Sequence, residues 1–180
     1  SWGDATMANR SFLSQREALT FVLSGLSKVA GLPQMKLGWI AANGPTAPLR
    51  VAQEGLDLIA DTYLSVGTPV QLAAASLLAS RQQLQPQISA RVTKNLSHLR
   101  TLSHDSACRM LSADGGWYAV LEIPRHFSEE EWVLKLLEDD HVLVHPGYFF
   151  NFEQEAFLIL SLLPPIETFE EACRRLLARF

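Results

Sequence analysis

A short apolar run ends in a cluster of small residues, and this junction limits the fold more than any other part of the sequence. Residues 18–23 read ALTFVL, and residues 24–27 read SGLS. Such a run is too short for a buried helix and suits a strand that is covered on both faces. Strands of that kind are typical of a parallel sheet flanked by helices. The junction therefore predicts an α/β fold.

The rest of the first part alternates between strand and helix patterns. A second strand is expected at residues 36–42, where Asn-Gly-Pro then ends it. Apolar residues recur at helical spacing over residues 49–63. Residues 71–81 are rich in alanine and leucine, which predicts a well-buried helix. These elements form a first domain, residues 1–82, whose start lacks periodicity and is expected to be a loop.

The second part, residues 83–180, is expected to begin with a long helix that Pro86 opens and that reaches about Leu111. Two later segments match the Ser/Thr-x-x-Glu capping box that starts a helix, at Ser128 and at Thr168. Strands are expected at residues 117–123, 141–145 and 157–162. The last helix carries an apolar stripe made of Phe169, Ala172, Cys173, Leu176, Leu177 and Phe180.

Charge and cysteine usage exclude several classes of protein. The chain has 15 basic and 19 acidic residues and no basic stripe, which argues against nucleic acid as a partner. No apolar run approaches the ~20 residues of a membrane span, and residues 1–4 do not resemble a signal peptide. Cys108 and Cys173 lack partners at metal-ligand spacing, so we expect two buried thiols in a reduced cytoplasm rather than a disulfide.

Lys28 directly follows the small residues, and Lys36 is the next cation along the chain. A lysine amine attacks a carbonyl only after losing its proton, and a desolvated site beside a second cation favours that neutral form. The charge of Lys36 and the hydroxyls of Ser24 and Ser27 could hold a phosphate dianion. A lysine after a strand can equally be a solvated loop residue, and the spacing alone leaves both interpretations open.

Several residue types at fixed offsets resemble the active-site segment of class I/II aminotransferases, the fold-type I enzymes that depend on pyridoxal phosphate. The matching positions are Ser27-Lys28, Gly31-Leu32-Pro33, Lys36 and Gly38-Trp39. The resemblance implies that Lys28 forms the Schiff base with pyridoxal phosphate and moves the α proton of the substrate. It also implies that Lys36, where the family more often has arginine, contacts the cofactor phosphate together with Ser24 and Ser27.

The resemblance extends along the chain to residues 64–71, 115–121 and 142–150. The last of these resembles a V-x-P-G-x-x-F loop close to the substrate, which suggests His145 and Tyr148 as substrate contacts. The fold implied is the C-terminal fragment of the aminotransferase fold. It comprises the tail of the large parallel-sheet domain and a small α/β domain, joined by a long helix. The resemblance further implies a cytoplasmic homodimer.

Three features depart from the family pattern. The family places an aspartate on the pyridine nitrogen of the cofactor, and Asp4, the only aspartate before Lys28, has no strand-like context. We therefore expect a portion of a longer enzyme that is inactive and binds the cofactor poorly by itself. An arginine that clamps the substrate carboxylate would fall near Ile159, but residues 157–161 contain none. Gly25 stands where the family often has a phosphate-binding serine.

The leading hypothesis is a transaminase that moves an amino group between an amino acid and a 2-oxo acid. The missing arginine keeps two alternatives open. A pyridoxal-dependent carbon-sulfur lyase would release pyruvate and ammonia without a keto-acid acceptor. A non-catalytic, aminotransferase-like sensor or dimerisation domain would have a helix-turn-helix encoded upstream. No metal site is expected, because Asp-Asp-His at residues 139–141 is more typical of a solvated helix end. Arg174 and Arg175 of the last helix are expected to lie on its solvated face.

Overall fold

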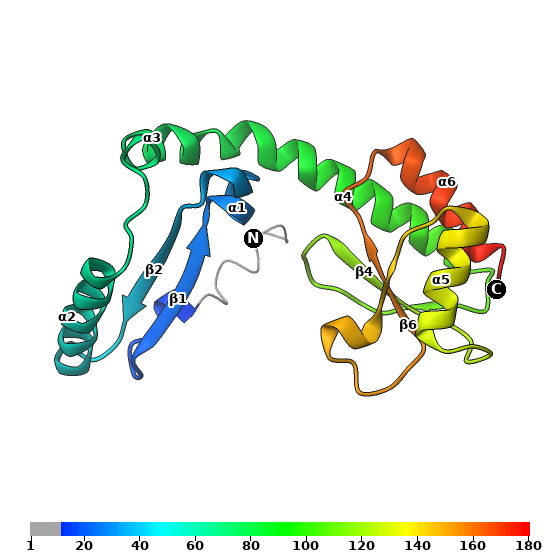
Figure 1. The fold of residues 1–180 in the computed structure, drawn as a ribbon, viewed down its shortest axis with the longest axis horizontal. Coiled ribbons are helices and arrows are strands. Elements are labelled where there is room, and N and C mark those ends of the chain that lie inside the picture. The colour runs from blue at the N-terminus through cyan, green and yellow to red at the C-terminus, as the bar shows by residue number, and fades with distance from the viewer. Residues whose placement is uncertain (1–11) are drawn as a thin grey trace. The chain divides into compact units, whose positions relative to one another are not determined.

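The computed structural model describes residues 12–180, so the predicted N-terminal loop and Asp4 lie outside it. The described residues form two compact units, one that ends at Pro86 and one that begins at Gln87. Both this boundary and the predicted one at 82/83 fall within helix α4 (Arg81–Ser103), drawn in green in Figure 1. None of the described helices is both long and apolar enough to cross a membrane.

The first unit is built around two paired strands, β1 (Thr20–Gly25) and β2 (Gly38–Asn43). They pair with each other antiparallel. The expectation that β1 is covered on both faces is not met within the described residues, because none of its side chains is buried and Leu23 is 73% exposed. The chain between these strands folds back through one helical turn and a 3-10 turn, so it provides no long crossover helix that parallel pairing needs.

Helices α2 (Thr46–Thr62) and α3 (Thr68–Ala79) complete the first unit, and they match the predicted helical segments. The prediction that the second of them is well buried is wrong for the described residues, because none of the α3 side chains is buried. Leu72, for example, is 83% exposed. The alanines and leucines of α3 predicted an apolar helix surface, but no other described element buries that surface.

The second unit holds a four-stranded antiparallel sheet in the order β3-β4-β6-β5. Its strands are β3 (Arg109–Met110), β4 (Tyr118–Glu122), β5 (His145–Pro146) and β6 (Phe157–Ser161). Helices α5 (Glu129–Asp140) and α6 (Ile166–Leu177) pack with α4 against one face of this sheet, as Figure 1 shows for β4 and β6. A 3-10 turn, Gly147–Phe150, lies between β5 and β6.

The core of the second unit lies between the helices and the inner face of the sheet. Leu99, Leu121, Leu136, Leu158 and Leu176 each come from a different element, and each is 0% exposed. Full burial of one such side chain contributes about 1.5–3 kcal/mol. The apolar stripe predicted for the last helix is confirmed, because its members are buried in this core or packed against it. Cys108 and Cys173 are free and buried, as predicted.

Local signals predicted some helix ends and missed others. The capping box at Ser128 is confirmed, since Glu131 N donates to Ser128 Oγ (3.2 Å) and Ser128 N donates to a Glu131 carboxylate oxygen (2.9 Å). The box at Thr168 is wrong, because α6 begins at Ile166 directly after Pro165. A proline holds φ near the helical value and can start the first turn without a side-chain cap.

Three further boundaries differ from the prediction. Helix α4 starts before Pro86 rather than at it, because a first turn has already formed at Ser80, whose carbonyl accepts the backbone N–H of Leu84 (3.2 Å). It ends at Ser103 rather than near Leu111, and the short strand β3 follows. The predicted strand 141–145 is reduced to its last residue, because His141 ends α5 in a left-handed conformation with φ 56°.

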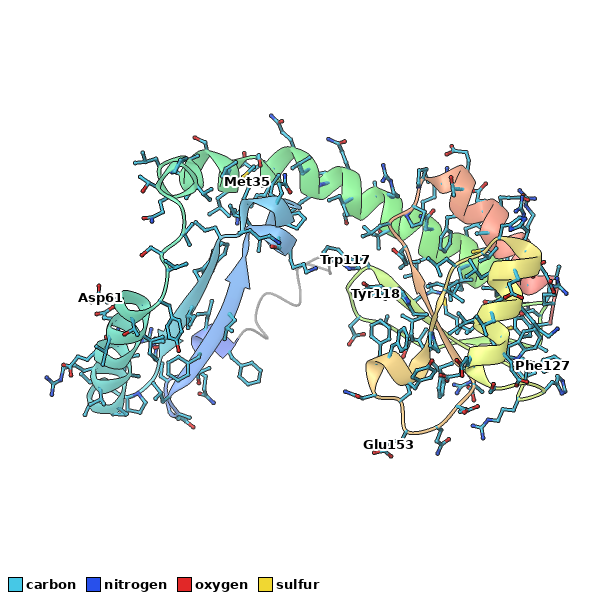
Figure 2. The ribbon with its side chains drawn as sticks, viewed as in Figure 1. Met35, Asp61, Trp117, Tyr118, Phe127 and Glu153 are labelled. Carbon is cyan, nitrogen blue, oxygen red and sulfur yellow. The ribbon has the colours of Figure 1, made fainter. Side chains whose placement is uncertain are left out.

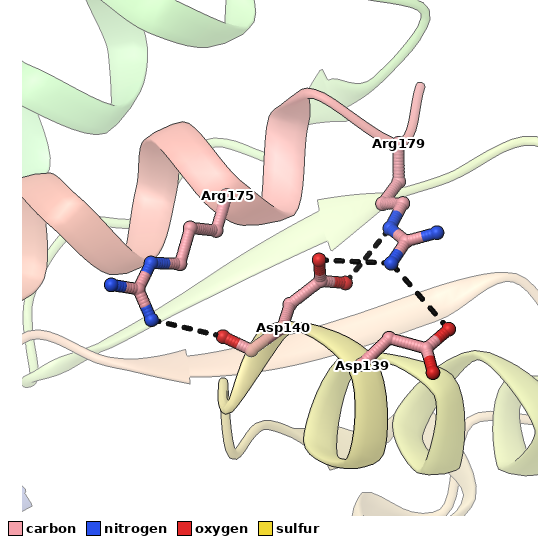
Figure 3. Close-up of polar contacts among 4 residues, drawn as sticks. All are labelled: Asp139, Asp140, Arg175 and Arg179. Atoms are coloured by element: carbon pink, nitrogen blue, oxygen red, sulfur yellow. Dashed lines mark hydrogen bonds and ion pairs between the residues drawn. The ribbon is translucent and has the colours of Figure 1, made fainter.

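The carboxyl end of α5 is tied to the end of the chain by ion pairs (Figure 3). Both carboxylate oxygens of Asp140 accept hydrogen bonds from Arg179, each at 2.9 Å, and Asp139 lies 3.4 Å from the same guanidinium. Arg175 donates to the backbone carbonyl of Asp140 (3.2 Å) and pairs with Glu171 (2.8 Å). The predicted solvated helix end and helix face are largely exposed, and ion pairs link the two.

Candidate active site

The four residues predicted to bind the cofactor lie around one pocket in the first unit. Ser24 lies near the end of β1, Ser27 and Lys28 lie on the helical turn α1 (Leu26–Val29), and Lys36 follows the 3-10 turn Pro33–Met35. All four line an open pocket of about 410 Å³. The structure thus brings together the residues that the motif grouped, and their individual roles stay predictions.

Two glycines allow the backbones of β1 and β2 to meet at this pocket. Gly25 pairs with Gly38 at the end of the strands. A Cβ atom at Gly25 would lie 2.8 Å from the carbonyl oxygen of Leu37, and one at Gly38 would lie 3.2 Å from that of Ser24. Position 25 therefore cannot carry a serine unless the backbone shifts. The side-chain hydroxyls that line the pocket are those of Ser24 and Ser27.

Two buried residues and one hydrogen bond hold the helical turn that carries Lys28. Leu26 and Ala30 anchor it, being 1% and 0% exposed. The side chain of Gln85 donates a hydrogen bond to the carbonyl of Val29 (2.7 Å). Because the turn is held at both ends, the backbone that presents Lys28 has a defined position relative to β1.

The pocket is positively charged. The charged residues that line it, among those the structure describes, are Lys28 and Lys36, and this pair favours an anion such as a phosphate. Lys36 ends the 3-10 turn Pro33–Met35 in a left-handed conformation with φ 50°, which costs of order 1 kcal/mol for a residue other than glycine. Lys28 was expected in a desolvated site. Within the described residues its side chain is instead exposed at the open mouth of the pocket.

The predicted substrate residues, His145 and Tyr148, lie in the second unit beside an aromatic cluster. The ring of His145 lies 6.1 Å from that of Phe149 and 6.2 Å from that of Phe150. Tyr148 meets Phe149 edge to face at 4.9 Å. Tyr118 of β4, labelled in Figure 2, meets Phe150 at 5.8 Å. Most of these side chains are partly exposed, so they can contact a ligand.

Ile159 occupies the centre of the sheet face opposite the helices. It pairs with Val120 on one side and His145 on the other, and neighbours opposite each other in a sheet share a face. The side chain is only 2% exposed. The ring of Phe150 lies near those of Tyr118 and His145 on the strands beside β6. The position expected to hold a carboxylate-binding arginine is therefore a buried apolar side chain.

One buried acid was not predicted from the sequence. Glu129, the first residue of α5, is 1% exposed, and its carboxylate accepts the backbone N–H groups of Tyr148 (3.0 Å) and Phe157 (2.7 Å). Glu129 is the first of three consecutive glutamates in the first turn of α5, and the preference of a helix N-terminus for negative charge explains such a run. That explanation treats all three alike, and nothing in the local sequence marks the first of them as buried.

Comparisons with known proteins identify the family. A sequence model described as "Aminotransferase class I and II" matches residues 1–176. The chain is 30% identical over 173 residues to glutamate-pyruvate aminotransferase AlaA of Haemophilus influenzae, covering 91% of this chain and 42% of that protein. It is 26% identical over 167 residues to alanine aminotransferase of Mycobacterium tuberculosis, covering 89% of this chain and 39% of that protein.

Solved structures agree in fold. An alanine aminotransferase from Pyrococcus furiosus superposes with a TM-score of 0.76 at 26% identity, covering 92% of this chain and 43% of that one. A tyrosine aminotransferase from Leishmania infantum gives a TM-score of 0.77 at 21% identity, over 92% of this chain and 42% of that one. The chain thus spans about two fifths of the length of the proteins it matches. Sequence and fold together show that the chain belongs to the family of class I and II aminotransferases.

Proposed function

We propose that this chain is the C-terminal portion of a pyridoxal-phosphate-dependent transaminase that moves an amino group between an amino acid and a 2-oxo acid. The observation that carries the proposal is the pocket in which Ser24, Ser27, Lys28 and Lys36 stand together. The relatives named as glutamate-pyruvate and alanine aminotransferases support glutamate and pyruvate as the first substrates to test.

The groups that line the pocket fit a phosphorylated aldehyde. Pyridoxal phosphate, when bound, supplies an aromatic ring that withdraws electrons from the bonds at the substrate α carbon. Lys36 and the hydroxyls of Ser24 and Ser27 would bind its phosphate. Lys28 Nζ would hold the cofactor covalently and carry the proton to and from the α carbon of the substrate.

The second unit would supply substrate contacts. His145 and Tyr148 both offer polar groups beside an apolar aromatic surface, a combination suited to an amino acid with a small or apolar side chain. We also propose a cytoplasmic homodimer. The exposed apolar residues of α3 support association with a further surface, and the two free thiols support a reducing compartment.

The test uses the protein encoded by the complete reading frame, loaded with pyridoxal phosphate. Borohydride reduction followed by peptide mass spectrometry should locate the cofactor adduct on Lys28. Lys28→Ala should abolish both the adduct and amino transfer from glutamate to pyruvate. Lys94→Ala, which removes an exposed lysine from α4, is the matched control and should leave both unchanged. An adduct on another lysine, or transfer by Lys28→Ala at the wild-type rate, would refute the assignment.

A carbon-sulfur lyase is the second candidate. The buried Ile159, where the expected carboxylate-binding arginine is absent, does not separate the two reactions, because the substrates of both carry an α-carboxylate. The two reactions have different requirements. A lyase would release pyruvate and ammonia from cysteine or cystathionine with no keto acid present. A transaminase would consume the amino donor only when a 2-oxo acid is supplied, so one assay with and without acceptor separates them.

A further inference from the structure

Glu129 is a buried carboxylate that joins the two ends of one loop. Its Oε2 atom accepts the backbone N–H of Tyr148 (3.0 Å), and its Oε1 atom accepts that of Phe157 (2.7 Å). Tyr148 lies at the start of the loop, and Phe157 is the first residue of β6. The side chain comes from another element, at the first position of α5.

The packing around this carboxylate leaves room for no side chain at position 147. Gly147 is buried, and a Cβ atom there would lie 2.9 Å from Glu129 Oε1 and 2.9 Å from the Cβ atom of Phe157. The second carboxylate oxygen would lie at 3.4 Å. Gly147 is therefore needed for the close approach of the backbone to the carboxylate.

A carboxylate fits this site, because each of its two oxygens accepts one backbone N–H group. Burial of a charge is costly unless its oxygens accept hydrogen bonds, and two backbone N–H groups together with the N-terminus of α5 provide that compensation. An amide of the same size could accept from one N–H only, because its nitrogen would face the other donor. The site thus distinguishes Glu129 from glutamine.

The loop held by Glu129 carries the aromatic side chains of the candidate substrate site. Tyr148, Phe149 and Phe150 all follow directly after the anchored Gly147, and all three are partly exposed. Two backbone hydrogen bonds inside the turn are long, at 3.3 Å from Asn151 N to Tyr148 O and 3.4 Å from Phe152 N to Gly147 O. The shorter bonds to Glu129 are the stronger restraint on its position.

We propose that Glu129 is a positioning residue for substrate binding: it fixes the loop from Gly147 to Phe157 and so sets the places of Tyr148, Phe149 and Phe150. Glu129 does not contact the reacting atoms. The substrate part of this inference rests on the proposed function, whereas the clamp itself is a property of the second unit alone.

The test compares Glu129→Gln with Glu130→Gln in the complete, cofactor-loaded protein. Glu130 is the exposed neighbour in the same helical turn, so both variants lose one charge at the same helix N-terminus. Hydrogen exchange of the amides of Tyr148 and Phe157 should accelerate by about tenfold in Glu129→Gln and stay unchanged in Glu130→Gln. KM for the amino donor should rise about tenfold while kcat and the cofactor absorbance stay within about twofold.

A second variant guards against a folding defect. Gly147→Ala keeps the carboxylate but displaces it, so it should reproduce the loss in KM, and the double variant should be no worse than either single one. Unchanged exchange at Tyr148 and Phe157 in Glu129→Gln would overturn the clamp. Faster exchange with an unchanged KM would overturn the positioning role. A wild-type protein that lacks transamination would instead overturn the proposed function and the substrate role with it, while the exchange result would still decide the clamp.

Discussion

Replacement of Asn95 by alanine should loosen the connection between β6 and α6. The side-chain amide of Asn95 is 0% exposed and donates to the backbone carbonyls of Leu162 (3.0 Å) and Pro164 (3.1 Å). On the same helix, Arg91 donates to the intervening carbonyl of Leu163 (3.2 Å). Three successive backbone carbonyls before α6 therefore accept hydrogen bonds from side chains of α4.

The structure sets the size of the effect. Loss of two hydrogen bonds, together with the desolvated carbonyls left behind, comes to about 4 kcal/mol. The Oδ1 atom of Asn95 is buried without a hydrogen-bond partner among the described residues, so its removal offsets about 1 kcal/mol. We expect Asn95→Ala to reduce the free energy of unfolding by about 3 kcal/mol. Asn95→Asp should cost more, because a carboxylate would face the same carbonyls.

The assay is urea unfolding of protein labelled with 5-fluorotryptophan, followed by fluorine NMR. Trp132 is 5% exposed in the core of the second unit, so its resonance reports that unit. With a slope of about 1.5 kcal/mol per molar urea, the midpoint should fall by about 2 M. Arg91→Ala is the control, since its hydrogen bond is exposed and should be worth less than about 1 kcal/mol. Equal shifts in the two variants would refute the reasoning.

Three further predictions follow from local features. Ser128→Ala removes the cap of α5 and should lower the free energy of unfolding by about 1 kcal/mol, measured by urea unfolding; no change would mean that the cap is not stabilising. Gly25→Ala places a Cβ atom against the carbonyl of Leu37 and should raise the dissociation constant of pyridoxal phosphate in the complete protein. Unchanged cofactor binding would show that the backbones of β1 and β2 move apart without disturbing the pocket. Burial raises the pKa of Cys108 to about 11 and that of Cys173 to about 12, so iodoacetamide at pH 8 should label neither thiol until the protein unfolds. Since both pKa values are raised from 9.0, their contribution to stability is present below pH 9 and is lost as the pH rises towards 12, and a flat pH profile in that range would contradict the burial.

Signals that lie within a few residues of each other were predictive. The capping box at Ser128 involves atoms three residues apart, and the stripe from Phe169 to Phe180 follows directly from the helical repeat. The grouping of Lys28 with Lys36 was predicted for the same reason, because a single short hairpin brings them to one pocket. Each of these features depends mainly on local backbone geometry.

Features that depend on distant segments could not be predicted. The apolar run that became β1 indicated a strand, but its antiparallel partner is set by the fold of the intervening turn. Glu129 could not be told apart from Glu130, because its burial is created by Gly147 and Phe157, which lie 18 and 28 positions further along the chain and fold back onto α5. For the same reason the Ala-rich composition of α3 indicated a helix but not whether it would be covered.

The ion pairs between Asp140 and Arg179 have a practical consequence for the design of shortened proteins. Arg179 binds the carboxyl end of α5, and the ring of the next residue, Phe180, lies 4.5 Å from that of Trp132 in the core. A truncation placed before Arg179 would remove both contacts at once. A shortened protein that is meant to keep the second unit stable should therefore retain residues 179 and 180.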